Sequence, residues 1–549
     1  MHTLLIRGGE VVTATDSYPA DVLVRGEQIA ALGHDLAVDG AEIVDASGCF
    51  VLPGLIDPHV HIALDTGIFR TADDWRIGTA TAALGGITTV IDFATQFPGQ
   101  DTRQAVANRQ REIVGATGRS PLPHIDYALH CMLTVLPTDN DTLDRWMADL
   151  VADGVSAIKI YTTYRPNYYQ DDASLLRSMR AAARAGLVVM VHAENDALVS
   201  AATAGHVAAG ETGLAYHGSA RPALAEVEAV HRCLFLADQA RCELYVVHCS
   251  VGRSAALIAA ARQRGQPVHA ETCPQYLLLD ERRYAGADAW RCIMQPPLRD
   301  PYQPAHLWQL LGDGSISALG TDHCDYTIAQ KLGFRPYRNP DLQPALDALR
   351  PDQQAVLEAR LGLFDGRRRG LEETAHVLNL DPQTVRMREL EAVRKLAAHH
   401  TVLEAAANEL EGFDLSQEAP RLPFTQTPGG LPGLQTTLPL LVTYGVLPGH
   451  LSWSDLVRLM STNPARIFKL HPRKGHLAPG ADADLVIYDP KGERTLADAE
   501  QATVGRFTPY AGMRVTGRVR DTFVRGQAVV RDGALAGPVG WGTYIPASF

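Results

Sequence analysis

The chain has 549 residues, too many for one ordinary hydrophobic core, so we expect at least two domains. Its 46% hydrophobic and 20% charged residues are typical of a globular protein, and a net charge of -12 argues against nucleic acid as the main partner of the whole chain. The N-terminus has no signal-like segment, no uncharged apolar run is long enough to span a membrane, and the 8 cysteines form no CxxC pair. We therefore expect a cytoplasmic protein without a membrane partner and with reduced, buried thiols.

Both ends of the chain predict short β-strands. The first fifty residues contain strand-like runs separated by Gly-rich turns (TLLIRGGEVV, ADVLVRGEQIAALG and AEIVDASGCFVLPG). The C-terminal stretch repeats this style in DADLVIYDP and GMRVTGRVRDTFVRGQAVVRDG. We therefore predict one β-sandwich domain assembled from residues 1–53 and 472–549.

The middle of the chain alternates apolar, strand-like runs with amphipathic, helix-like segments. The strand candidates are GGITTVIDFA, IDYALHCML, VSAIKIY, GLVVMVHAE, CELYVVHCS, QPVHAETCP and ISALGTDH. This alternation indicates parallel βα units and an α/β fold. We predict a (β/α)₈ TIM barrel over residues 54–332 and 426–471, with a doubly wound sheet as the competing architecture. The doubly wound sheet is disfavoured because no Gly-rich first turn is present.

Residues 333–425 interrupt this alternation. They are poor in strand-like runs and rich in Arg, Glu, Leu and Ala, which predicts several helices. We expect an inserted helical domain in or after the last strand of the barrel.

Ionisable residues stand beside the strand-like runs, where a (β/α)₈ barrel carries its active site. In a strand, residues two apart point to the same face, so His59 and His61 can hold one ion. His192 and His248, from later strands, are candidate ligands of a second ion. Imidazole suits zinc and its neighbours, and the series predicts a site for two divalent metal ions. A lone histidine at a strand end is more often structural; the prediction depends on the whole series in this order.

Lys159 and Asp322 complete this series. An amine buried near cations would be neutral, and a neutral amine can add carbon dioxide to become a carbamate that bridges two ions. Lys159 is therefore the predicted N6-carboxylysine. Asp322 would complete one coordination shell and accept a proton during attack on a carbonyl.

At these residues the chain resembles the amidohydrolase superfamily and, within it, the dihydropyrimidinase/hydantoinase group. The motifs that carry the resemblance include GLIDPHVHI, AIKIY, VHAEND, VHCS, HAETCPQYL, GTDHC and STNPARIFKLHPRKGHLAPGADADLVIYDP. The resemblance implies hydrolytic opening of a cyclic amide or imide ring at a binuclear zinc centre and a homo-oligomer, a dimer or tetramer. It also assigns the oxyanion-polarising tyrosine to Tyr164.

The chain departs from this group at its substrate-binding positions. The Met-Pro-Phe loop of hydantoinases is replaced by Ala63-Leu64-Asp65, and Ala63 disfavours a carboxylate-bearing ring. The serine before the Pro-Pro pair is replaced by Gln295, and Thr443 lies near the position of a substrate-binding asparagine. We predict Tyr164, Leu64, Gln295 and Thr443 as substrate-binding residues and leave the ring substrate open.

The insertion has a second resemblance, to the helix-turn-helix of sigma factor region 4. It spans about residues 348–400, with LEETAHVLNL as the first helix and QTVRMRELEAVRKL as the recognition helix. The resemblance implies DNA contacts at Gln383, Arg386 and Arg388. Because acidic residues are interspersed, the segment is close to neutral, which favours a lid or an oligomer contact over DNA binding. Two hypotheses therefore stand: a cyclic-amide hydrolase, and a hydrolase scaffold that regulates through DNA or a protein partner.

Overall fold

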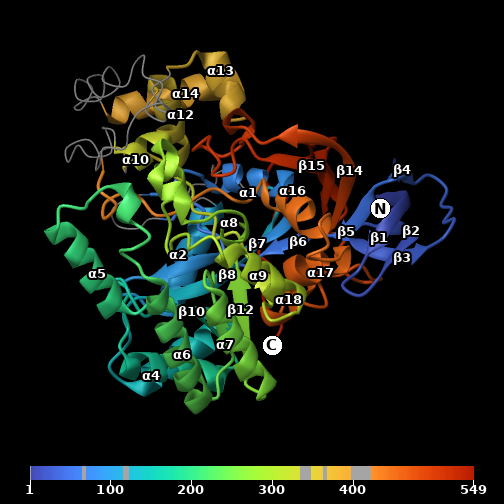
Figure 1. The fold of residues 1–549 in the computed structure, drawn as a ribbon. Coiled ribbons are helices and arrows are strands. Elements are labelled where there is room, and N and C mark those ends of the chain that lie inside the picture. The colour runs from blue at the N-terminus through green and yellow to red at the C-terminus, as the bar shows by residue number, and fades with distance from the viewer. Residues whose placement is uncertain are drawn as a thin grey trace.

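The computed structural model describes residues 2–64, 70–114, 123–333, 346, 348–362, 368–396 and 422–549. Asp65 and parts of the predicted insertion lie outside these residues. Figure 1 shows a strand-and-helix body with a β-rich lobe on one side and a group of helices above it. No helix in the described part of the chain is long and apolar enough to cross a membrane.

The body is built on one eight-stranded parallel sheet, in the order β13-β12-β11-β10-β9-β8-β7-β6. The first and last strands approach each other through a bridge between Val60 and His323, so the sheet is a nearly closed barrel. The strands are β6 (Leu55–Asp57), β7 (Ile87–Gln96), β8 (Asp126–Leu133), β9 (Ala157–Tyr161), β10 (Val188–His192), β11 (Leu244–Val246), β12 (Val268–Thr272) and β13 (Ala318–Leu319). Each of the seven predicted runs contains or overlaps one of them, and the parallel barrel is confirmed.

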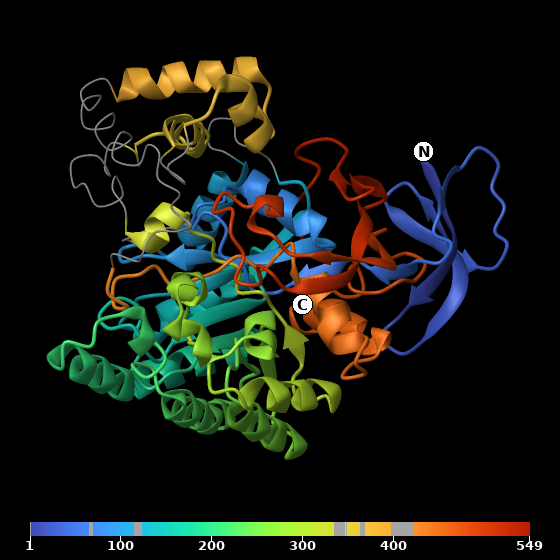
Figure 2. The ribbon, with the colours of Figure 1, turned by 45° about the horizontal axis from the view of Figure 1, so that its top comes forward.

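Helices cover the outer surface of the barrel (Figures 1 and 2). Several begin at an aspartate or asparagine whose side chain accepts a hydrogen bond from the first turn, as Asp171 does before α4. The main ones are α1 (Trp75–Leu84), α2 (Thr102–Val114), α3 (Asn140–Ala152), α4 (Asp172–Ala185), α5 (Asp196–Ala208), α6 (Ala223–Ala240), α7 (Gly252–Gln263), α8 (Pro274–Leu278), α9 (Gln303–Gly312), α10 (Ile328–Leu332), α16 (Thr437–Leu441), α17 (Trp453–Val457) and α18 (Asn463–Ile467).

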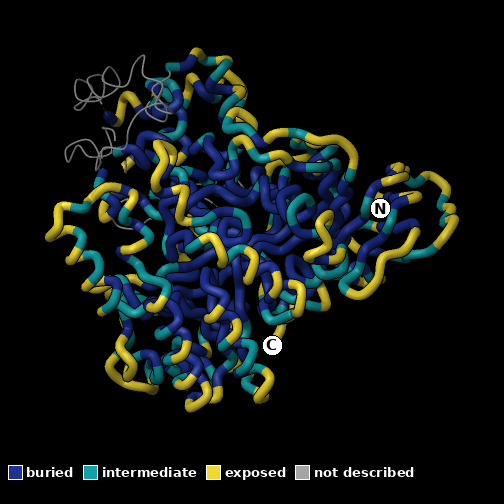
Figure 3. The backbone as a smooth tube through the Cα atoms, in the orientation of Figure 1, coloured by how far each residue is buried: buried dark blue, intermediate teal, exposed yellow. Residues whose placement is uncertain are grey.

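Side-chain alternation along the strands separates two layers of the core. In β9, Ile158 and Ile160 pack outward in the core shared with the helices, whereas Ala157 and Tyr161 pack inside the barrel. Lys159 has the inward register of Ala157 and Tyr161. Figure 3 shows how completely the barrel strands are buried. The two-residue period of a strand thus directs this lysine into the barrel interior.

Strands from both ends of the chain form a second, mixed sheet, seen on the right of Figure 2. Its order is β17-β16-β15-β14-β5-β1-β2-β3, and β4 pairs with β1. The expected β domain from both termini is confirmed as a single mixed sheet; two stacked sheets of a sandwich stay a prediction. The strands are β1 (Thr3–Val12), β2 (Ser17–Arg25), β3 (Gln28–Gly33), β4 (Glu42–Asp45), β5 (Phe50–Pro53), β14 (Leu485–Thr495), β15 (Arg514–Val524), β16 (Gln527–Arg531) and β17 (Ala534–Leu535).

Three helices within the predicted insertion stand at the top of Figure 2: α12 (Pro351–Leu361), α13 (Leu371–Val377) and α14 (Pro382–Lys395). Their buried residues include Val356, Ala375 and Val385, which form a small core of their own. This core packs against Ala72 and Val504, on the loop after β6 and on the C-terminal part of the chain. The helices therefore pack against the segment that follows His59 and His61.

Candidate metal centre

The ionisable landmarks of the sequence meet at one end of the barrel. The histidines and Asp322 lie at or just beyond the carboxyl ends of β6, β10, β11 and β13, and Lys159 points inward from the middle of β9. All of them line one cavity of about 770 Å³. The predicted residues found there are His59, His61, Leu64, Lys159, Tyr164, His192, His248, Gln295 and Asp322.

Three of these side chains form a compact group of donor atoms. The Nε2 atoms of His59 and His61 lie 3.4 and 3.3 Å from the same Asp322 Oδ1. One ligand atom from each residue lies within 4.8 Å of the others. Two imidazoles and a carboxylate at this spacing suit a divalent ion such as zinc.

Lys159 and two further histidines extend this group. The Lys159 Nζ lies 3.4 Å from His59 Nε2, and His192 Nδ1 lies 3.0 Å from His248 Nε2. All of these side chains are almost completely buried. Burial lowers the pKa of the Lys159 amine to about 8 and lowers the pKa values of His59, His192 and His248. The three histidines are thus favoured as neutral nitrogen donors, and the Lys159 amine loses its proton more readily than a free lysine does.

Asp322 is the anionic member of the cluster. Burial would raise the pKa of its carboxyl group, but the neighbouring His59, His61 and Lys159 hold that pKa below its usual value. The backbone of Asp322 adopts a φ of 52°, in the left-handed region that non-glycine residues rarely occupy. Tyr164 (φ 74°) and His248 (φ 39°) share this property. Such backbone strain is concentrated where side chains are aimed at a functional site.

Glu271, a residue without a role predicted from the sequence, holds His59. The Glu271 carboxylate accepts hydrogen bonds from His59 Nδ1 (2.9 Å), from Tyr245 Oη (2.9 Å) and from the His248 backbone N–H (2.9 Å). Because Nδ1 is engaged in this way, the lone pair of His59 Nε2 faces Asp322. A carboxylate behind a histidine is the usual arrangement in metal sites. Its signal in the sequence was its inward register in β12, two residues after His269.

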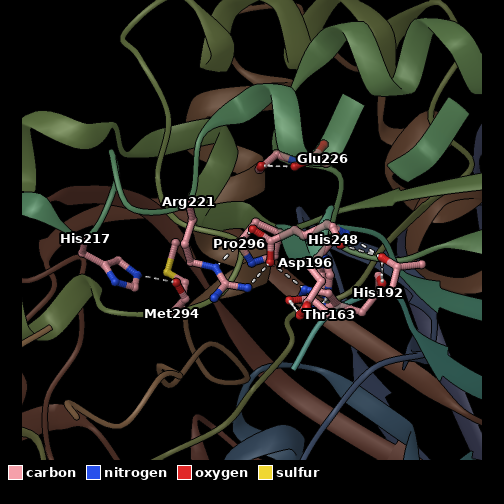
Figure 4. A network of polar contacts seen from close by, with 12 residues as sticks. Thr163, His192, Asp196, His217, Arg221, Glu226, His248, Met294 and Pro296 are labelled. Atoms are coloured by element: carbon pink, nitrogen blue, oxygen red, sulfur yellow. Dashed lines mark hydrogen bonds and ion pairs between the residues drawn. The ribbon is translucent and has the colours of Figure 1, made fainter. Parts of the chain in front are cut away.

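Glu194 plays the same part for His192 and was also missed. Its Oε2 lies 2.7 Å from His192 Nε2, and Arg221 binds both of its oxygens. Burial would raise the pKa of Glu194, but Arg221 and His192 hold it well below its usual range. His192 therefore turns its Nδ1 atom, not Nε2, towards His248. Figure 4 shows Arg221 reaching towards His192 and His248.

Gln295 and Gly429 are in close contact in the wall of this cavity. A Cβ atom added to Gly429 would lie 1.9 Å from Gln295 Oε1, so the carboxamide of Gln295 occupies the space that a side chain at 429 would need. Residues 425–430, which return from the insertion, form the rest of this wall. The buried Lys331 amine donates to the carbonyl oxygens of Ile293 (2.9 Å) and Pro428 (2.8 Å) and so joins the two wall segments.

Thr443, the fourth predicted substrate-binding residue, is not among the residues that line this cavity. Thr443 lies in the helical turn Val442–Val446, and its hydroxyl donates to Pro439 O (2.7 Å) and accepts from the Thr516 N–H (2.8 Å). It thus faces β15 and does not line the cavity. The hydroxyl completes hydrogen bonds between the helical segment and the β domain, which a short sequence motif cannot reveal.

The three residues predicted to contact DNA do not form a basic reading surface. Arg388 forms an ion pair with Asp352 of α12 (3.1 Å), whereas Gln383 and Arg386 are exposed on α14. Two more ion pairs, Arg350–Glu391 (2.7 Å) and Arg360–Glu389 (2.8 Å), join the two helices. Arg388, Glu389 and Glu391 of α14 are thus paired within the insertion, and the sigma-factor resemblance gains no support.

A parallel barrel with histidines and an aspartate gathered at its carboxyl end is typical of barrel hydrolases. Comparison with family models shows to which family of these hydrolases the chain belongs. Models of the amidohydrolase family match residues 50–394 and 427–530. The first range includes α12, α13 and α14. The chain belongs to the amidohydrolase family.

Within this family the chain is similar to hydantoinases and dihydropyrimidinases over its whole length. It is 32% identical to a D-hydantoinase of Geobacillus stearothermophilus, over 99% of this chain and 96% of the relative. The dihydropyrimidinase of Brevibacillus agri has the same fold, with a TM-score of 0.79 and 30% identity over 100% and 99% of the two chains. The L-hydantoinase of Arthrobacter aurescens aligns with a TM-score of 0.75 and 25% identity over 100% of both chains. The chain is a hydantoinase/dihydropyrimidinase-like amidohydrolase.

Proposed function

We propose that this protein opens the ring of a cyclic amide or imide, of the hydantoin or dihydropyrimidine type, by hydrolysis at a centre of two divalent metal ions, most simply zinc. One observation carries the proposal: the His59–His61–Asp322 donor group shares a cavity with Lys159, His192 and His248. Full-length similarity to hydantoinases supports the substrate class.

The donor atoms form two sets that fit this role. His59 Nε2, His61 Nε2 and Asp322 Oδ1 would hold one ion, and His192 Nδ1 and His248 Nε2 the other. Lys159 would serve both ions as a carbamate. Its neutral amine adds carbon dioxide and releases one proton, giving an anion with two oxygens, and the burial that lowers its pKa to about 8 supplies that neutral amine.

When bound, the two ions would supply a hydroxide nucleophile near neutral pH and polarise the carbonyl group that it attacks. Asp322 accepts the proton of the attacking water and passes it to the leaving ring nitrogen. Tyr164 donates a hydrogen bond to the carbonyl oxygen as negative charge develops there. Because its pKa is raised by burial, this phenol keeps its proton at neutral pH and can act as a donor.

The cavity walls favour an uncharged ring. Tyr161, Tyr164 and Tyr168 and the apolar Leu64 form much of the lining. Arg165 is the only arginine among the described lining residues, and it pairs with Asp196 (2.9 Å) and stacks on Tyr169. A substrate carboxylate would therefore lack a free cationic partner. Gln295, which lines the same cavity, would hydrogen-bond an amide edge of the ring.

The decisive experiment measures metal and carbamate together with activity. Purified protein should contain about two metal ions per chain and hydrolyse hydantoin, dihydrouracil or a cyclic imide. Growth with ¹³C-bicarbonate should give a carbamate resonance that is lost in Lys159→Ala, whereas Lys469→Ala, at the surface, should keep it. Protein that holds no metal, shows no carbamate and leaves all three rings intact would rule the proposal out.

The resemblance also leads us to propose a homo-oligomer, a dimer or tetramer. Within the described residues, the pairing of Arg388, Glu389 and Glu391 across the insertion argues against the DNA-binding alternative. Sedimentation at several protein concentrations would measure the subunit number.

A further inference from the structure

Arg221 lies immediately before α6, outside the set of candidate metal donors, yet its side chain ends beside two of the proposed functional residues. The guanidinium binds Glu194 through Nε (Oε1, 3.1 Å) and through Nη2. Its side chain is only 12% exposed and Glu194 is fully buried. A bidentate arginine–carboxylate pair at a buried position has one strongly preferred geometry.

Glu194 transmits that geometry to His192. Its Oε2 lies 2.7 Å from His192 Nε2, which leaves His192 Nδ1 facing His248. The backing of His59 is different, because Glu271 is held by the neutral Tyr245 hydroxyl and a backbone N–H. Among the described candidate ligands, His192 is the one that hydrogen-bonds a carboxylate that is itself fixed by a guanidinium.

Arg221 also contacts Tyr164. The guanidinium carbon lies 5.2 Å from the centre of the Tyr164 ring, and that ring lies 4.9 Å from the ring of His192. Tyr164 occupies a left-handed backbone conformation, with φ 74°, which needs support from its surroundings. A cation against an aromatic face within about 6 Å is attractive, most of all where water is excluded. The Arg221 guanidinium therefore contacts the ring of Tyr164 directly and orients His192 through Glu194.

We propose that Arg221 is a positioning residue that fixes the orientations of both His192 and Tyr164. In this way it couples retention of the second metal ion to stabilisation of the carbonyl oxygen. This inference rests on the proposed function of the two residues. An ion pair that merely stabilised the fold would affect neither metal affinity nor the contribution of Tyr164.

The test replaces Arg221 by Gln and by Lys and compares both with Arg232→Gln. Arg232 is a matched control because it pairs with two carboxylates, Glu228 and Asp172, on the outer side of α6 and contacts neither His192 nor Tyr164. Cobalt titration of metal-free protein, followed by visible absorption, measures the two metal equivalents without relying on turnover. Kinetics with a cyclic amide substrate supply kcat and KM.

Arg221→Gln should weaken the second cobalt equivalent about 10- to 100-fold and leave the first unchanged, as expected for the loss of a residue behind a ligand. It should lower kcat about 100-fold with KM within about threefold, and Arg221→Lys should recover part of both losses. In a cycle with Tyr164→Phe the two losses should be less than multiplicative, because Arg221 acts in part by orienting the hydroxyl that Tyr164→Phe removes.

Equal cobalt titrations and equal kinetics for Arg221→Gln and Arg232→Gln would overturn the positioning role. Fully multiplicative losses in the Tyr164 cycle would overturn the coupling. Wild-type protein that binds no cobalt and opens no ring would instead remove the proposed function itself, a result distinguishable because it appears before any substitution is made.

Discussion

The barrel mouth and the three insertion helices both contain basic and acidic side chains, but these side chains form separate pairs in the insertion and one shared cluster at the barrel mouth. Between α12 and α14, three arginines each meet a carboxylate, as Arg360 and Glu389 do at 2.8 Å. At the barrel mouth, several buried nitrogen donors and one carboxylate converge instead, with His59 and His61 sharing Asp322 Oδ1. Paired surface charges hold two helices together, whereas an excess of buried lone pairs creates a place for cations.

The largest effect is expected at the shared carboxylate of the barrel mouth. Asp322→Asn keeps the size of the side chain but removes the charge that His59 and His61 both face, and with it the proposed proton acceptor. We expect kcat to fall by about 10³-fold or more and the metal content to drop. Metal analysis and steady-state kinetics measure this. Asp280→Asn, whose partner Arg282 lies at the surface, should behave like wild type; equal activity of the two variants would contradict the role of Asp322.

A smaller effect is expected at the cavity wall. In Gly429→Ser the new Cβ atom would collide with the Gln295 carboxamide and displace it. We expect KM to rise about tenfold with kcat within about threefold, because substrate binding is affected more than the reacting atoms. Gly205→Ala, where nothing lies within 4 Å of an added Cβ, is the control. If Gly429→Ser raised KM as much in a Gln295→Ala background, displacement of Gln295 could not be the cause.

The next prediction concerns stability at the join of the first and last strands. The buried carboxyl groups of Asp73 and Asp325 accept hydrogen bonds from the Val504 and Gly505 N–H groups, and burial raises the pKa of Asp73 to about 7. Because this pKa is raised on folding, the stability it contributes is complete below about pH 4 and is lost as pH rises through 7. Asp73→Asn should therefore gain stability relative to wild type between pH 5 and 8, on the order of 2 kcal/mol.

Urea unfolding at pH 5, 6, 7 and 8 measures this difference. The exposed Asp532→Asn serves as the control and should show a constant difference from wild type. A difference for Asp73→Asn that stayed constant, or that shrank as pH rose, would show that Asp73 is ionised in the folded protein.

The smallest effect is expected in the insertion. Arg388→Gln removes the ion pair with Asp352, which keeps Arg350 as a partner at 3.1 Å, so we expect a loss of about 0.5–1 kcal/mol in unfolding free energy. Ring-opening activity should stay within about twofold of wild type, as it should in Arg386→Gln, which alters an exposed residue of the same helix. If the protein formed a salt-dependent DNA complex that both substitutions abolished, the DNA-binding hypothesis would be restored. The insertion helices would then be a binding surface as well as the barrel mouth.

The positions of candidate site residues could be predicted from the sequence where the local pattern fixes the direction of a side chain. The inward register of Lys159 follows from the two-residue period of β9, and the strand-end positions of His192 and His248 follow from apolar runs that stop beside them. Glu194 is part of the VHAEND motif, but neither it nor Arg221 could be assigned a role, because their contact joins two segments that meet only in the folded chain. The sequence could not show that the Thr443 hydroxyl bonds Pro439 and Thr516, because resemblance near a motif does not show which way a helical segment faces.

The sequence by itself determined the parallel barrel, the β domain drawn from both ends and the residues that meet at the barrel mouth, because strand period and strand order are local properties that the chain carries directly. Only the tertiary structure decided which carboxylate lies behind each histidine, that Gln295 occupies the space above Gly429, and that the charges of α14 pair with those of α12. Those outcomes depend on distances between segments far apart in the chain, and such distances exist only once the barrel has closed.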